Sequence, residues 1–167
     1  MRFAPAGVAL SLALVLTASV GHSAPPQPLD PRAATLVAQG RAALAGGNAD
    51  GAIDAFEAAL AIQPGATAIT LDLAEATRRQ GLQGKALHYY REALERDPQN
   101  LVAISGEGAA LVEKGALEKA KRNLTRLQGL CGESCPETRD LAALIARAGA
   151  TQVVSAEAVK PSPTVAN

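Results

Sequence analysis

Residues 52–64 read AIDAFEAALAIQP, and residues 86–98 read ALHYYREALERDP. Alanine, an aromatic residue, alanine and proline stand at the same places in both stretches, which are offset by 34 residues. A weaker third copy, residues 120–132, reads AKRNLTRLQGLCG. A pattern that returns at a fixed period of this length predicts a chain built from repeated structural units.

The first two stretches have the apolar spacing of one helix face. The first carries this stripe: Ala52, Ile53, Phe56, Ala59 and Leu60. These positions form one continuous face at a period of 3.6 residues, which predicts a helix packed on one side. Pro64 and Pro98 are expected to end the first two such helices, because proline cannot continue a helix.

An earlier helix in each unit completes a predicted helical hairpin. In the first unit this helix covers residues 33–45, the Gly-Gly-Asn run at 46–48 interrupts it, and Asp50 is expected to cap the next helix. Small residues return in the earlier helices at the same period: Gly40, Ala74 and Gly108. Short side chains let the paired helices approach closely, with Phe56 and Tyr90 filling the space beside the contact.

The C-terminal part of the repeat array reads as an end. Lys121 and Gln128 replace apolar residues of the earlier units, as expected for a terminal repeat. A further helix over residues 136–148 has apolar residues at helical spacing and is predicted to cover the end of the stack. The pattern stops at Gly149, so residues 149–167 are predicted to be a disordered tail.

These units resemble tetratricopeptide repeats over about residues 33–134. The residues that carry the resemblance are Leu36, Gly40, Ala52, Phe56, Ala59 and Pro64, then Leu73, Ala74, Ala86, Tyr90, Ala93 and Pro98, then Gly108, Ala120 and Leu124. The resemblance implies an all-α fold, an α-solenoid of three hairpins at about 33–66, 67–100 and 101–134 plus a capping helix. The family's usual Trp of the first helix is absent, with Leu36, Thr70 or Ile104 in its place.

The composition argues against nucleic-acid binding and against a β-sandwich fold. The formal net charge is zero and aromatic residues make up 2% of the chain. Nucleic-acid binding needs a basic surface or aromatic platforms for stacking, so no nucleic acid is expected as a partner. The core must be built from Ala, Leu, Ile and Val, which suits closely packed helices better than a β-sandwich.

The N-terminus has the layout of a secretory signal peptide. Met1 and Arg2 give a positive start, an uncharged apolar run follows, and small residues precede Pro25. We expect cleavage near residue 23, a Pro-rich linker over 24–32, and a periplasmic or secreted protein without stable membrane insertion. An uncleaved membrane anchor is the alternative, although the apolar run is short for a full span.

Cys131 and Cys135 stand where the third unit meets the capping helix. In an oxidising compartment a pair this close is expected to form a disulfide. A redox-active pair or a metal site is the alternative, but the only histidines are His22 and His88, and no metal or cofactor is expected. The run at 130–137 resembles the closing segment of small secreted bacterial proteins of this repeat type.

The resemblance also implies a binding surface, because first helices line the concave face in this family. The predicted partner-binding residues are Val37, Arg41, Leu71, Glu75, Arg78, Ser105 and Val112. The lining lacks the Lys and Asn set with which chaperone-binding members hold a terminal carboxylate. Some of these residues, Val37 and Leu71 above all, could instead pack between repeats.

The functional prediction is therefore an interaction scaffold or adaptor of the cell envelope that binds a protein or peptide segment, and not an enzyme. Two alternatives stay open. One is a self-associating structural subunit, and the other is a small enzyme that uses the repeats as a scaffold. No constellation of acid, base and nucleophile is visible, because His88 has no second histidine beside it once the signal is removed.

Overall fold

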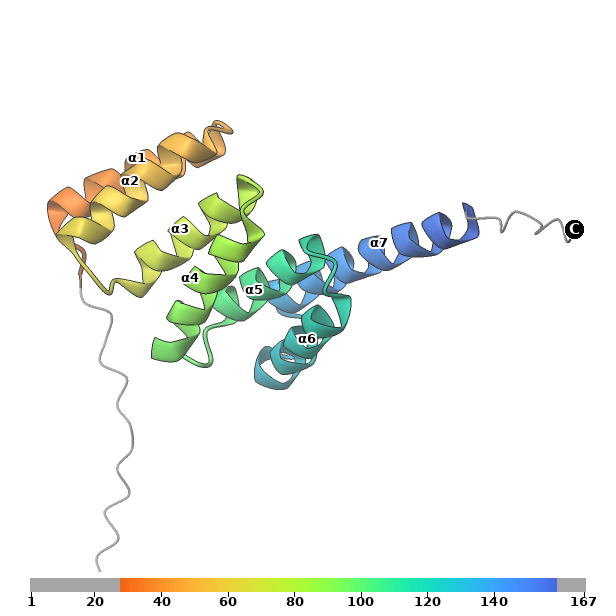
Figure 1. Cartoon of the computed structure of the whole chain (residues 1–167). Coiled ribbons are helices and arrows are strands. Elements are labelled where there is room, and N and C mark those ends of the chain that lie inside the picture. The colour runs from red at the N-terminus through yellow and green to blue at the C-terminus, as the bar shows by residue number, and fades with distance from the viewer. Residues whose placement is uncertain (1–27, 159–167) are drawn as a thin grey trace, which may run out of the picture.

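The computed structural model describes residues 28–158, with side chains through residue 150 (Figure 1). Within that range the regular structure is helical, without strands. The helices are α1 (Pro31–Ala45), α2 (Ala49–Ile62), α3 (Thr67–Arg79), α4 (Gln83–Arg96), α5 (Leu101–Glu113), α6 (Leu117–Cys131) and α7 (Pro136–Ala158). The predicted signal peptide and the last residues of the predicted tail, 159–167, lie outside the described residues.

Polar side chains fix where the first two helices begin. Asp30 caps α1, where its Oδ1 accepts a hydrogen bond from the Arg32 backbone N–H at 2.8 Å. Asn48 caps α2 by accepting from the Gly51 N–H at 2.9 Å. The prediction that Asp50 is this cap is wrong, because α2 begins at Ala49 and Asp50 lies in its first turn. A carboxylate there still interacts favourably with the helix dipole.

The turns inside the hairpins depend on glycine. Gly47, Gly81 and Gly115 have φ angles of 81°, 86° and 77°. Residues with a Cβ atom avoid this left-handed region, whereas glycine enters it freely. Glycine therefore returns at the 34-residue period because the same turn is made in each unit.

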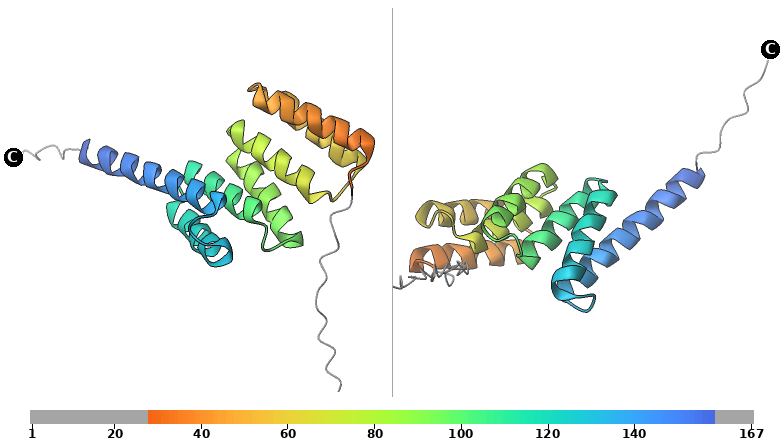
Figure 2. Two further views of the ribbon diagram at one scale, coloured as in Figure 1. Left: turned by 180° about the vertical axis from the view of Figure 1, so that it is seen from behind. Right: turned by 90° about the horizontal axis from the view of Figure 1, so that it is seen from below.

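Helices α1 and α2, α3 and α4, and α5 and α6 pack as three successive hairpins (Figures 1 and 2). The second helix of each hairpin contacts the helix that follows it, and α7 packs on both α5 and α6. This arrangement confirms the predicted α-solenoid with a C-terminal capping helix.

Helix α7 is longer than the predicted cap. It continues through Gly149 to Ala158 and projects beyond the stacked hairpins (Figure 1). The predicted start of a disordered tail at residue 149 is therefore wrong for residues 149–158. A single glycine in a helix is only about 1 kcal/mol less favourable than alanine, and the alanines on either side of it favour a continuing helix.

The core runs along the stack as three linked clusters of mainly aliphatic side chains. Phe56 is fully buried against Gly40, where a Cβ atom would lie 2.5 Å from its ring. Gly108 makes the corresponding space for Leu141 of α7, since a Cβ there would lie 2.5 Å from that side chain. The periodic small residues thus admit a large neighbour, as predicted for Gly40.

The third hairpin differs from the others at its outer face. Lys121 and Gln128 are exposed, in agreement with the sequence. Leu127 stands where the other units have alanine, and it is fully buried with Ile104 and Leu141. The larger side chain fills the space between α5, α6 and α7, which ties the capping helix to the stack.

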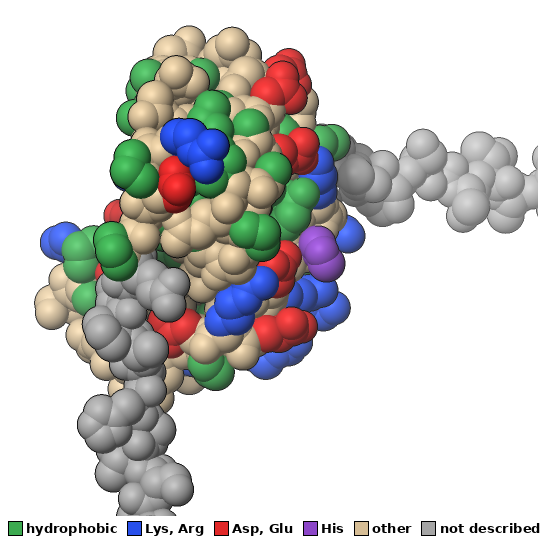
Figure 3. Space-filling model, turned by 90° about the vertical axis from the view of Figure 1, so that its left-hand side faces the viewer, with side chains coloured by type: hydrophobic (Ala, Val, Ile, Leu, Met, Phe, Trp, Pro, Cys, Tyr) green, Lys and Arg blue, Asp and Glu red, His purple; other side chains and the backbone are tan. Residues whose placement is uncertain are grey.

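Positive and negative side chains are mixed on the face formed by the N-terminal end of the stack (Figure 3). This distribution agrees with the zero net charge of the chain. Among residues 28–158, no helix has both the length and the apolar character needed to cross a membrane.

Candidate partner-binding groove

A pocket of about 460 Å³ lies between α3, α5 and the start of α7. Its lining residues are Leu71, Asp72, Glu75, Arg78, Tyr90, Val102, Ser105, Gly106, Ala109, Pro136, Glu137, Asp140 and Leu144. We call this set the α3–α5–α7 groove. Three of its walls come from first helices or the capping helix, and α4 contributes only Tyr90.

The apolar part of the groove includes an unusually accessible side chain. Val102 on α5 is 54% exposed and is one of few large apolar side chains so exposed in the described part of the chain. Leu71 on α3 and Leu144 on α7 are partly buried and line the same pocket. An apolar strip of this kind gains free energy when another apolar group covers it.

A cluster of charges at one side of the groove joins α3 to α5. The Arg78 guanidinium donates to both Glu75 carboxylate oxygens, at 2.9 and 2.8 Å, and also to Glu113 of α5. Arg79 donates to Glu75 at 2.7 Å, and the Tyr90 hydroxyl donates to the same carboxylate at 3.1 Å. Both Arg78 and Glu75 are thus held by several partners within the fold.

These contacts shift the acidity of the groups involved. Burial alone would raise the pKa of Glu75, but the hydrogen bonds from Arg78 and Arg79 outweigh it and hold the pKa below its usual value. For Tyr90, burial first and then the negative charge of Glu75 raise the pKa above the ordinary value. Glu75 therefore stays ionised and Tyr90 stays a neutral donor at neutral pH.

A second ion pair joins α1 to α3 beside the groove. Arg41 Nη2 lies 2.7 Å from Asp72 Oδ2, and Nε lies 3.0 Å from the same oxygen. The Arg41 side chain is 60% exposed, so water screens the pair and its effect on stability is small. It fixes the position of the Asp72 carboxylate, which lines the groove.

The first turns of α7 supply two further carboxylates, from Glu137 and Asp140. Among the described side chains, neither carboxylate has a hydrogen-bond or ion-pair partner. The link between α5 and α7 is instead made by Ser105, whose Oγ donates to the Glu137 backbone oxygen at 3.3 Å. Ser105 thus has a structural contact and no base beside it.

The structure places the predicted binding residues unequally. Leu71, Glu75, Arg78 and Ser105 line the groove, and Arg41 lies next to it on Asp72. Val112 is only partly buried, but it packs against the core clusters and not into the groove.

Val37 needs a correction. It is 4% exposed and belongs to the buried stripe of α1 with Ala33 and Gly40, at i, i+4 and i+7. This stripe faces α2 and α3 in the core, so Val37 packs between helices and is not available to a partner.

The contribution of α7 to the groove was not predicted. The sequence pattern predicts only that this helix covers the end of the stack. In the structure it also contributes four residues to the groove lining: Pro136, Glu137, Asp140 and Leu144. The sequence does contain an indication of this role, because one further step of 34 residues places Asp140 in register with Asp72 and Gly106. Extending the period would have identified α7 as one more groove-lining first helix.

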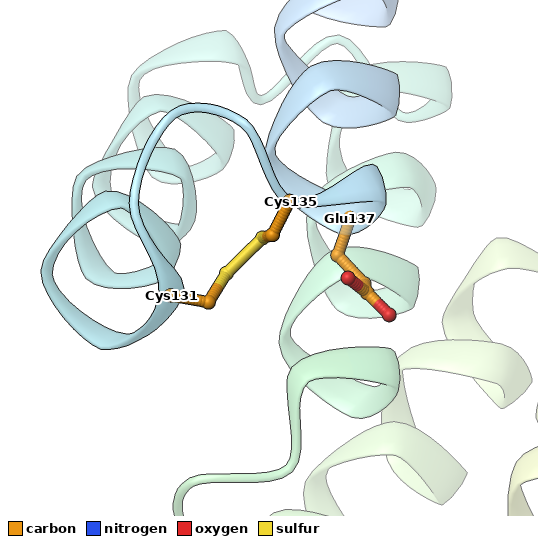
Figure 4. A group of neighbouring side chains, drawn as sticks. All are labelled: Cys131, Cys135 and Glu137. Carbon is orange, nitrogen blue, oxygen red and sulfur yellow. A yellow bond between two sulfur atoms is a disulfide. The ribbon is translucent and has the colours of Figure 1, made fainter.

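Cys131 and Cys135 are joined in the structure, with Cα atoms 5.9 Å apart, at the turn between α6 and α7 (Figure 4). Glu137 stands beside them, and one candidate ligand atom from each of the three residues falls within 4.8 Å of the others. Metal ligation by cysteine requires thiolates, which a disulfide does not provide. This cluster therefore fits a covalent tie between α6 and α7 better than a metal centre.

His88 lies away from the groove. It is exposed on α4 beside Tyr89, with ring centroids 5.6 Å apart. Lys85 approaches the other ring, with its Nζ 5.8 Å from the Tyr89 centroid. His88 and Lys85 are exposed, whereas Tyr89 is partly buried and also packs against two of the core clusters.

Comparisons with known proteins agree with this architecture. Residues 37–100 match the family described as "Tetratricopeptide repeat". A comparison with curated protein sequences found no match.

Solved structures share the fold. The first TPR domain of human RPAP3 is 24% identical, with a TM-score of 0.64 over 74% of this chain and 97% of that domain. The first TPR of Spaghetti (RPAP3), bound to the HSP90 peptide SRMEEVD, is 24% identical, with a TM-score of 0.63 over 74% and 99% of the two chains. The Sgt2 TPR domain of Aspergillus fumigatus is 23% identical, with a TM-score of 0.66 over 83% and 91%.

The family match covers the first two hairpins, and the third repeats their geometry at the same period. Residues 37–100 thus match the tetratricopeptide-repeat family, and the solved TPR domains share the fold of the chain.

Proposed function

We propose that this protein is an interaction module that holds a segment of a partner protein in the α3–α5–α7 groove. The observation that carries the proposal is the groove itself, a pocket of about 460 Å³ with an exposed apolar residue, Val102, between charged walls. Such a surface provides apolar contact for affinity and polar contacts for orientation. Its Ser105 hydroxyl donates to a backbone oxygen, and its Tyr90 hydroxyl, although bonded to Glu75, is buried and has a raised pKa, which favours binding over catalysis.

The solved neighbours support a peptide as the ligand class. The Spaghetti domain is bound to the HSP90 peptide SRMEEVD. The present groove differs from the chaperone-binding pattern, because Val37, where a lysine would serve that pattern, is buried in the core. We therefore infer a different partner segment held by the same kind of fold.

We further propose that the protein works in the periplasm or outside the cell. The proposal is supported by residues 1–23, which have the sequence features of a secretory signal peptide and are followed by a Pro-rich segment. Sequencing the N-terminus of the exported protein tests this directly. The expected mature chain begins near residue 24, and a chain that starts at Met1 and sediments with membranes would contradict the proposal.

The binding proposal is tested with a random-peptide display library panned against the mature protein. Val102→Asn removes an exposed apolar group from the groove, and Leu130→Asn makes the same kind of change at a site that is 39% exposed on α6. Covering part of a valine contributes about 1–1.5 kcal/mol, so we expect roughly tenfold weaker binding of the selected peptides by Val102→Asn. Leu130→Asn is expected to leave their binding unchanged.

Selected peptides whose affinity drops with Leu130→Asn and not with Val102→Asn would place the binding surface elsewhere. A concentration-dependent dimer in size-exclusion chromatography with light scattering, broken by Val102→Asn, would instead identify a self-associating subunit.

A further inference from the structure

We propose that the partner segment presents a cationic side chain, Lys or Arg, next to an apolar one. This inference rests on the proposed function, since it names the chemistry of the segment that the α3–α5–α7 groove holds. It follows from the charges that line the groove and from which of those charges are already paired.

The charged lining is predominantly acidic. It contains four carboxylates, from Asp72, Glu75, Glu137 and Asp140, and one guanidinium, from Arg78. A segment that lies here therefore meets mostly negative groups.

The one cation of the lining is already engaged. Arg78 is held by Glu75 and by Glu113, and its side chain is only 19% exposed. Two further cations described above pair with groove carboxylates, Arg41 with Asp72 and Arg79 with Glu75. Each of these three arginines already has a carboxylate partner within the fold.

Two carboxylates of the groove have no such engagement. Glu137 and Asp140 have no ion-pair partner among the described side chains, and Asp140 is exposed. They lie one turn apart on α7, so their negative charges are close to each other and gain from a cation placed between them. The apolar residues Val102 and Leu144 line the same pocket.

This arrangement disfavours acidic segments. The peptide SRMEEVD held by the Spaghetti domain carries three acidic side chains. In the present groove such a segment would meet unpaired carboxylates on α7, and like charges at short range repel. A segment with Lys or Arg beside Leu, Ile or Val satisfies both the carboxylates and the apolar strip.

The test is a second round of peptide display. The library is panned in parallel against the mature protein, against the double variant Glu137→Gln/Asp140→Asn, and against a control with the same change in charge, Asp54→Asn/Glu95→Gln. Asp54 on α2 and Glu95 on α4 are exposed, lie outside the groove, and have no ion-pair partner in the described structure. Only peptides whose binding is weakened by Val102→Asn are counted as groove ligands.

We expect groove ligands of the native protein and of the control to be enriched in Lys or Arg adjacent to an aliphatic residue. Their affinity should fall about tenfold in the α7 double variant and should weaken as salt is added, because screened charges attract less. Enrichment of acidic or uncharged groove ligands, or equal affinity for the double variant, would overturn this inference while leaving the proposed function intact. Failure to obtain any ligand sensitive to Val102→Asn would overturn both.

Discussion

Gly106 on α5 sets how closely this helix approaches α4, and replacing it should be costly. A Cβ atom at Gly106 would lie 2.3 Å from both Cε1 and Cζ of Tyr90. Ordinary contact begins at 3.4 Å, so the ring would have to retreat by 3.4 − 2.3 = 1.1 Å. Tyr90 is 2% exposed and its hydroxyl is bonded to Glu75, which leaves the ring no free direction.

The net effect of Gly106→Ala combines two opposing terms. Overpacking of a filled core costs about 1–3 kcal/mol, and a displacement this large belongs in the upper half of that range. Alanine in a helix interior gains about 0.5–1 kcal/mol over glycine. We therefore expect Gly106→Ala to lower the free energy of unfolding by about 1–2.5 kcal/mol.

Two matched variants make this prediction specific. Gly129 on α6 has nothing within 4 Å of a built Cβ, so Gly129→Ala should raise the free energy of unfolding by about 0.5–1 kcal/mol. In a Tyr90→Leu background the obstructing ring is gone, and Gly106→Ala should become neutral or stabilising there. Urea titrations followed by circular dichroism measure these three differences in the free energy of unfolding. If Gly106→Ala stabilises the native protein as much as Gly129→Ala does, the close approach of α4 and α5 is absent.

Two further predictions concern pH and the disulfide. Because the folded pKa of Glu75 lies below the usual 4.5, its contribution to stability is full above about pH 4.5 and is lost as the pH falls toward the folded pKa. Glu75→Gln should therefore lower the free energy of unfolding at neutral pH, and its urea midpoint should fall less than that of the native protein as the pH is lowered. A difference between the two proteins that is the same at every pH would contradict this origin. Glu95→Gln is the exposed control. Thiol trapping with non-reducing mass spectrometry should find Cys131 and Cys135 bonded in exported protein, and two alkylated cysteines would refute the bond. Since the loop between them is very short, Cys131→Ser/Cys135→Ser should cost only about 2 kcal/mol or less.

The fold could be predicted from sequence because each unit solves the same packing problem. Gly47, Gly81 and Gly115 make the same left-handed turn, so their 34-residue period records backbone geometry directly. The buried stripe of α2, with Ala52, Phe56 and Ala59, is likewise a local pattern that one helix displays on its own. Local constraints of this kind repeat whenever the unit repeats.

The groove was only partly predictable because exposure depends on neighbours that differ from unit to unit. Val37, Leu71 and Ser105 occupy one register position, yet Val37 is buried while the other two line the groove. Ser105 and Gly106 line the groove together with residues of α7, and the first unit has no counterpart of α7 from which this could be predicted. The apolar stripe predicts a buried ring for Tyr90, which the structure confirms, but not the hydrogen bond from its hydroxyl to the groove carboxylate of Glu75.

The same register explains why the carboxylates that α7 contributes to the groove have no ion-pair partner among the described side chains. Asp72 is neutralised by Arg41, which stands 31 positions before it on the preceding first helix. The residue 31 positions before Asp140 is Ala109, which cannot form an ion pair. At the 34-residue period, Arg41 corresponds to Glu75 in the second unit and to Ala109 in the third. Each earlier pair of first helices is joined by an ion pair, Arg41 to Asp72 and Arg78 to Glu113, whereas α5 and α7 are joined by the Ser105 hydroxyl. The series of inter-helix ion pairs thus stops one helix early, and Asp140 has no ion-pair partner among the described side chains, which leaves its carboxylate available to a cationic group of a partner.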